Sequence, residues 1–196
     1  MFRIKKIIGR QIIDSRGNPT CEADIILDDG TLGRGAVPSG ASTGKLEAIE
    51  IRDNDPDLYL GKSVNKAVNN INHVISAAIN ASTAFDQESF DKFLIELDGT
   101  SNKERLGANT ILALSIAFAK AIANKNNIQL YQSLTEDSSY MLPIPMMNII
   151  NGGAHANNKL DFQEFMILPI GFDKITESIR AGAEIFHTLK NALNRI

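Results

Sequence analysis

The sequence predicts an α+β fold in which about three antiparallel strands come first, helices follow, and a strand pair with one helix ends the chain. Two short apolar runs, 20–27 and 32–37, flank an Asp-Gly dipeptide, which is a strong hairpin signal. Apolar residues then recur every three or four positions between 62 and 123. A polar stretch without periodicity at 133–140 predicts a linker, so we expect two domains, 1–135 and 141–196.

The first domain is expected to begin with a sheet, because apolar residues within 4–13 add a third strand to the hairpin. Helices are predicted over 62–80, from Asp86 as N-cap to about Leu97, and over 109–123. The last of these is apolar nearly all round, so it should be buried between other elements.

The second domain is expected to contain strands at 143–150 and 162–168, joined by a polar loop. A parallel crossover usually needs a helix in the connection, and 151–161 shows no helical apolar stripe, so the strands should be antiparallel. The loop and the start of the second strand then lie at the same end of the pair. A last helix is predicted from Asp173 onward.

The composition is that of an ordinary globular protein, and it excludes several classes of partner. Lys and Arg number 20 against 23 Asp and Glu, a net charge of −3, so we expect no nucleic-acid partner. No apolar run approaches the ~18 residues of a membrane span. Charges interrupt the first residues, so no signal peptide is expected. Cys21 is the only cysteine, and we expect a cytoplasmic protein.

Two polar stretches are candidate sites. The first, 39–44, reads Ser-Gly-Ala-Ser-Thr-Gly, whose hydroxyl oxygens suit a hard cation such as Mg²⁺ and whose glycines allow a close approach to a ligand. On composition alone, a solvated linker is the favoured explanation of this segment. The second stretch is Asn-Gly-Gly-Ala-His at 151–155, followed by Gln163 and Glu164.

Together with three further segments, these stretches resemble enolase. Asp-Ser-Arg-Gly-Asn-Pro-Thr at 14–20 is similar to the family's opening signature, Gly-Ala-Asn at 107–109 to its mid-domain helix, and Pro-Ile-Pro-Met-Met-Asn at 143–148 to the strand that opens its barrel. The segments occur in the family's order from Arg10 to about Leu193. The resemblance implies an N-terminal capping domain followed by the first ββα part of an enolase-type (β/α)8 barrel.

The resemblance also implies a reaction and its participants. Enolases are hydro-lyases that interconvert 2-phosphoglycerate and phosphoenolpyruvate plus water, with Mg²⁺ as cofactor, and they commonly form homodimers through the N-terminal domain. On the family's pattern Ser42 is a ligand of the second Mg²⁺, and Gly40, Ala41 and Thr43 supply the closing geometry of its loop.

The second stretch carries the other implied roles. His155 would contact the substrate near its phosphate and hydroxyl, Gln163 would bind substrate, and Glu164 would be one acid of the pair around the leaving hydroxide. A surface histidine and a solvated carboxylate are the alternatives. In a regular strand Gln163 and Glu164 would point to opposite faces, so contact of both with one ligand would need a twist or a frayed start of the strand. The family often has serine before the histidine and glycine after the next alanine, whereas here Ala154 precedes and Asn157-Asn158 follow.

Two other chemistries fail on the residues. A phosphate-binding P-loop needs glycine and Ser or Thr where this chain has Ser39 and Leu46 around Gly44-Lys45. Three scattered histidines and one cysteine make no evident zinc motif.

The chain is about half the family's length. The family's Gly-Asp-Glu-Gly-Gly motif, the three carboxylates for the first Mg²⁺ and the catalytic lysine have no counterpart in these 196 residues. We therefore expect the chain alone to be inactive, either as a part of an enolase completed elsewhere or as a non-catalytic domain that acts by interaction or self-association.

Overall fold

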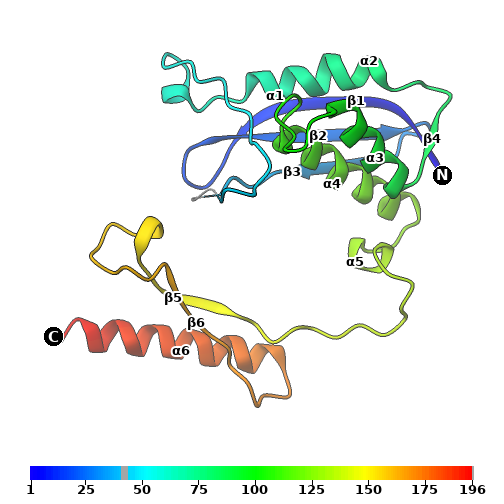
Figure 1. The fold of residues 1–196 in the computed structure, drawn as a ribbon. Helices are drawn as coiled ribbons and strands as arrows, with labels where there is room; N and C mark the ends of the chain where they lie inside the picture. The colour runs from blue at the N-terminus through cyan, green and yellow to red at the C-terminus, as the bar shows by residue number, and fades with distance from the viewer. Residues whose placement is uncertain (41–43, 196) are drawn as a thin grey trace. The chain divides into compact units, whose positions relative to one another are not determined.

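The computed structural model describes residues 1–40 and 44–195, which form two compact units. The first unit comprises Met1–Gly40 and Gly44–Glu136, and the second begins at Asp137. The first unit contains a four-stranded sheet and the second a two-stranded one (Figure 1).

The sheet of the first unit is antiparallel and has the order β3-β2-β1-β4. Its strands are β1 (Phe2–Ile13), β2 (Pro19–Leu27), β3 (Leu32–Ala36) and β4 (Ala84–Phe85). The predicted hairpin between β2 and β3 is confirmed, with Gly30 at φ +90° and its N–H donating to Leu27 O at 3.0 Å. The sequence predicted about three strands, and β4 is the additional one.

One face of this sheet packs against helices. Gly33 and Gly35 alternate along β3, and a Cβ atom on Gly33 would lie 2.1 Å from the backbone O of Ala117. The helix that contains Ala117, α4 (Ala108–Lys125), therefore approaches the strand more closely than any side chain would allow. Ala113, Leu114, Ala117 and Phe118 are fully buried there, so the prediction of a buried helix is confirmed.

The remaining helices of the first unit are short or capped. The predicted helix over 62–80 is a continuous stretch made of α1 (Asn65–Asn69), a π-helical segment (Asn70–Ile75) and α2 (Ser76–Ala78). Ala67, Ile71 and Ile75 form its buried stripe. The others are a 3-10 turn (Tyr59–Gly61), α3 (Gln87–Asp98) and α5 (Leu130–Ser133).

The predicted N-cap of α3 is confirmed. Asp86 Oδ1 accepts from the Ser89 N–H at 2.8 Å, and the Asp86 N–H donates to Ser89 Oγ at 2.9 Å. These bonds satisfy backbone donors that have no partner within the helix. The Ser89 hydroxyl, which donates to Asp86 Oδ1 at 2.6 Å, and the Ser89 N–H lower the pKa of the Asp86 carboxyl.

Replacing this cap should weaken the first unit measurably. We expect Asp86→Ala to lower the free energy of unfolding by about 1 kcal/mol, because the first turn of α3 loses its acceptor. Urea unfolding followed by far-ultraviolet circular dichroism measures the change. Glu96→Ala, at an exposed position within the same helix, is the matched control and should stay within about 0.5 kcal/mol. Equal losses in the two variants would contradict the capping role.

The second unit is a strand pair and a helix. The strands β5 (Met147–Asn151) and β6 (Glu164–Ile167) are antiparallel, as predicted, and a 3-10 turn (Gly153–His155) lies in the loop between them. β5 begins four residues later than predicted, after Pro143 and Pro145. Proline has no N–H to donate to a ladder, so this stretch stays outside the sheet.

The helix of the second unit, α6 (Ile175–Leu193), is anchored by small residues. Ser178 Oγ donates to Pro169 O at 3.2 Å, and Gly182 lies against the thioether of Met147 in β5. Other apolar side chains of α6 stay exposed, among them Ile179 at 52% and Leu193 at 56%.

Among the described residues, no helix combines the length and apolarity needed to cross a membrane.

Candidate functional site

Three polar side chains meet at one end of the β5–β6 pair. His155 Nδ1 lies 3.0 Å from Glu164 Oε1, and His155 Nε2 lies 2.8 Å from Gln163 Nε2. The imidazole thus contacts both of the polar residues that the sequence singled out after it. His155 and Glu164 are 22% and 28% exposed, so the cluster is shielded on one side and accessible on the other.

The loop between the strands places His155 over the start of β6. Asn151, the last residue of β5, pairs with Glu164, the first residue of β6. The chain turns immediately after Asn151, where a Cβ atom on Gly152 would lie 2.4 Å from Phe162 O and where Gly153 adopts φ +52°. Only glycine accepts both the close approach and the left-handed conformation without strain. The two glycines therefore bring the 3-10 turn back toward β6.

Gln163 and Glu164 both reach His155, although side chains of adjacent residues in a regular strand point to opposite faces. The strand is not regular here, because Gln163 lies in a bend and β6 begins only at Glu164. Adjacent side chains point to opposite faces only within a regular strand. Because Gln163 lies in a bend before β6, its side chain and that of Glu164 can both reach the imidazole.

The contacts define where the imidazole proton lies. The Gln163 side chain presents an amide N–H to His155 Nε2, so Nε2 accepts this hydrogen bond. In a neutral imidazole the proton is then on Nδ1, which donates to the Glu164 carboxylate. Glu164 thus holds both the tautomer and the orientation of His155, in the way that a carboxylate orients a histidine in many active sites.

The described residues do not by themselves form a magnesium site. Mg²⁺ prefers several oxygen ligands in octahedral geometry, whereas Glu164 is the carboxylate of this cluster and is engaged with His155. Within 1–40 and 44–195, no group of three or more His, Cys, Asp or Glu side chains is placed to hold a metal ion. Ser42, the expected ligand, lies outside the described residues, as do Ala41 and Thr43.

Gly40 is described, and it belongs to the first unit, whereas His155, Gln163 and Glu164 belong to the second. The residue before it, Ser39, is held firmly. Arg16 Nη2 donates to Ser39 O at 2.7 Å, Ser39 Oγ donates to Glu50 Oε2 at 3.0 Å, and Arg52 Nη2 donates to Ser39 Oγ at 3.2 Å. The start of the Gly/Ser segment is therefore anchored by three charged side chains.

Sequence reasoning assigned no role to Glu50 or Arg52. The two are separated from Ser39 by 11 and 13 positions, so no local motif marked them. Arg16 lies in the segment 14–20 that resembles the family's opening signature, and its hydrogen bond to Ser39 O connects that segment to the start of the Gly/Ser segment.

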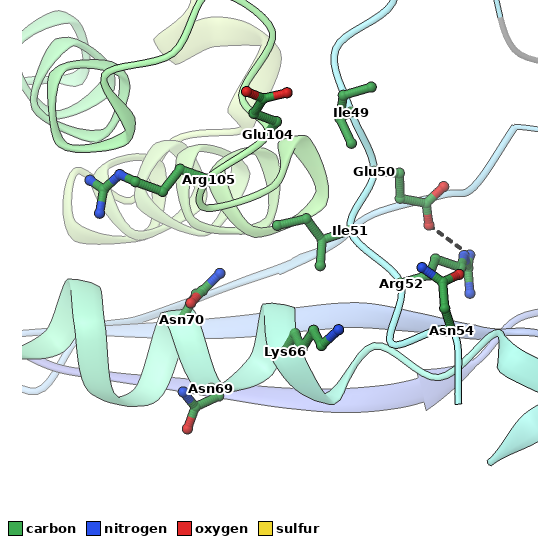
Figure 2. A pocket seen from close by; sticks show the side chains of 10 residues that line it. All are labelled: Ile49, Glu50, Ile51, Arg52, Asn54, Lys66, Asn69, Asn70, Glu104 and Arg105. Atoms are coloured by element: carbon green, nitrogen blue, oxygen red, sulfur yellow. Dashed lines mark hydrogen bonds and ion pairs between the residues drawn. The ribbon is translucent and has the colours of Figure 1, made fainter. Parts of the chain in front are cut away.

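An open hollow in the first unit is a second candidate site (Figure 2). Its volume is about 490 Å³, and residues of 49–54, 66–70 and 104–105 line it. The dashed line in Figure 2 joins Glu50 to Arg52, whose Nη2 lies 2.6 Å from Glu50 Oε1. Arg52 also donates to the carbonyl oxygens of Pro19 and Lys62. Its guanidinium is thus engaged by the protein.

Comparison with family models agrees with the arrangement of both units. Residues 4–134 match the model of the enolase N-terminal domain. Residues 139–196 match the model of the enolase C-terminal TIM barrel domain. The α+β unit is thus an enolase N-terminal domain, and the two strands and helix that follow are the start of the enolase barrel domain. Both matches lie in the family's order and together span nearly the whole sequence, so the chain belongs to the enolase family of lyases.

Proposed function

We propose that His155, Gln163 and Glu164 are part of an active site that interconverts 2-phosphoglycerate and phosphoenolpyruvate plus water. The observation that supports this most strongly is the hydrogen-bonded cluster itself, in which one imidazole contacts both Gln163 and Glu164. His155 reaches Gln163 and Glu164, which lie 8 and 9 positions further along the chain, across the loop between β5 and β6.

The chemistry of the cluster suits the loss of a hydroxide. A leaving hydroxide must take up a proton to depart as water, and a carboxyl group in reach of it can donate one. Glu164 is one acid of the pair around the leaving hydroxide in this proposal. His155 donates a hydrogen bond to the Glu164 carboxylate and so holds that carboxylate in place. The second N–H of the Gln163 amide supplies a donor for an oxygen of an anionic substrate, and the protonated form of the His155 imidazole would add a donor at Nε2.

Further parts of the proposal rest on the family alone. Mg²⁺ would bind with Ser42 among its ligands, and Gly40, Ala41 and Thr43 would shape the loop. No step above depends on the cation. Self-association through the first unit and a cytoplasmic location complete the proposal.

The proposal is tested by the binding of 2-phosphoglycerate, because binding needs only part of a catalytic site. We expect 2-phosphoglycerate with Mg²⁺ to shift the imidazole resonances of His155 in the 196-residue chain. His155→Gln should weaken binding about tenfold, which corresponds to the loss of one hydrogen bond to a charged group. Isothermal titration measures the affinity, and the matched control is His187→Gln on α6, which carries the same substitution at an exposed position.

Two results would contradict the proposal. One is an unchanged His155 resonance at saturating 2-phosphoglycerate. The other is equal weakening by His155→Gln and His187→Gln, which would indicate nonspecific association with the second unit.

A non-catalytic role is the second candidate, and the exposed apolar side chains of α6 favour it. Ile179, Phe186 and Leu193 recur every seven positions along α6 and are 43% to 56% exposed, and an exposed apolar helix face is a common site of contact with a partner. Chain association without any Mg²⁺-dependent binding of 2-phosphoglycerate would support this candidate.

A further inference from the structure

We propose that Asn158 is a positioning residue for His155: its carboxamide closes the loop between β5 and β6 and holds the imidazole in the tautomer that Glu164 and Gln163 require. This inference rests on the proposed function of the His155 cluster. The side-chain hydrogen bonds of Asn158 within the described residues go to Asn151 and Leu160 and not to Gln163 or Glu164, so its action is through the loop.

Both ends of the Asn158 carboxamide are used. Its Nδ2 donates to the backbone O of Asn151 at 2.9 Å, and its Oδ1 accepts from the Leu160 N–H at 3.0 Å. The first bond joins the last residue of β5 to the far side of the loop. The second joins Asn158 to the segment that leads into β6. His155 lies inside the ring that the first bond closes.

The rest of the loop depends on these two bonds. Leu160 O accepts from the Gly153 N–H at 2.8 Å, so the residue that Asn158 holds also holds the start of the 3-10 turn. The turn continues through the His155 N–H, which donates to Gly152 O at 3.0 Å. A chain of hydrogen bonds thus leads from Asn158 through Leu160 and Gly153 to the backbone of His155. A separate backbone hydrogen bond, from the Gly152 N–H to Gln163 O at 2.9 Å, also joins the turn to the segment that leads into β6.

The neighbouring Asn157 is the same residue type in the same loop but does not make the bridge that Asn158 makes. Asn157 is also exposed, and it takes part in no hydrogen bond found among the described residues. Asn157→Ala is therefore a matched control for Asn158→Ala: both remove one carboxamide from the same loop, and only one removes a bridge.

The tautomer of His155 reports on this role more directly than stability does. The chain has three histidines, His73, His155 and His187, so long-range ¹H–¹⁵N correlation spectra of the ¹⁵N-labelled chain can resolve their rings. The signals that disappear in His155→Gln are assigned to His155. At a pH where the ring is neutral, we expect His155 to carry its proton on Nδ1. Asn158→Ala should lower the ratio of the Nδ1–H to the Nε2–H form about five- to tenfold, as expected for the loss of one or two exposed hydrogen bonds. Asn157→Ala should leave the ratio unchanged.

A second variant separates the two bonds and covers a failure of the first to fold. Asn158→Asp keeps an acceptor for Leu160 N–H and loses the donor to Asn151 O. We expect it to lower the ratio as Asn158→Ala does, while the His73 and His187 signals stay in place. Ratios within twofold of the wild type in both Asn158 variants would overturn the positioning role and leave the proposed function intact. A wild-type His155 without the Nδ1–H form would overturn both.

Discussion

Purified residues 1–196 are expected to give no detectable conversion of 2-phosphoglycerate to phosphoenolpyruvate, even with Mg²⁺ in excess. The family's lysine base and the carboxylates of its first Mg²⁺ have no counterpart in these residues. A positioned general base contributes about 10²–10⁴ to a rate. Stabilisation of developing charge contributes a further factor of about 10²–10³. The loss of both leaves a rate below the background of most assays.

The ultraviolet absorbance of phosphoenolpyruvate follows the reaction continuously. A complete enolase under the same conditions is the positive control, and Ser42→Ala is the variant that separates this chain's own activity from a contaminant. Turnover by the wild-type chain that disappears with Ser42→Ala would overturn the prediction. Turnover that survives in Ser42→Ala would identify a contaminating enzyme, and the prediction would stand.

The parts of the fold that could be predicted are those with a local cause. The Asp-Gly turn predicts its hairpin because the glycine alone accepts φ +90° there. Asp86 predicts the start of α3 because its bond to Ser89 spans three residues. In both cases the interacting groups are neighbours in the sequence, so the pattern and the structure carry the same information.

The strand that was missed has no local cause. β4 contains Ala84 and Phe85, and its pairing partners, Arg3 and Phe2, are more than 80 positions away. A run of two residues shows no periodicity, so nothing in its neighbourhood distinguishes it from a loop.

The candidate site divides in the same way. The antiparallel strand pair predicted that His155 and the start of β6 lie at one end of the sheet, and the structure places them in contact. Contact of both Gln163 and Glu164 with one ligand requires an irregular strand start, and the sequence does not show whether the strand is irregular there; the structure has a bend at Gln163. The bridge by Asn158 was also beyond prediction, since its two partners are backbone groups, which every residue type offers.

Asp24 is another residue whose importance the sequence does not reveal. It lies at the centre of β2, is 3% exposed, and faces away from the helices on the same side of the sheet as Arg10 and Arg34. Arg34 donates to both of its carboxylate oxygens, from Nε at 2.7 Å and from Nη2 at 3.0 Å, and Arg10 Nη2 donates to Oδ2. These hydrogen bonds, first from Arg34 and then from Arg10, hold the pKa of the Asp24 carboxyl far below its usual range.

The depressed pKa makes part of the stability of the first unit dependent on pH. Between the folded pKa and the unfolded value near 4, the unfolded chain binds the proton and the folded one does not. The contribution of Asp24 is therefore complete above about pH 4 and decreases as the pH falls toward the folded pKa. Replacement by asparagine keeps the shape of the side chain but removes the charge at every pH.

We expect Asp24→Asn to lower the free energy of unfolding by about 2 kcal/mol at neutral pH, because the two guanidinium groups lose a charged acceptor. The difference from the wild type should shrink below about pH 4, where the wild-type carboxylate loses its advantage. Urea titrations at several pH values, followed by circular dichroism, measure both effects. Asp57→Asn, which removes an exposed carboxylate, should change stability by less than about 0.5 kcal/mol. A gap between Asp24→Asn and the wild type that stays constant down to low pH would show that asparagine disturbs packing, and the ion cluster on this face of the sheet would then have no part in the acid sensitivity of the unit.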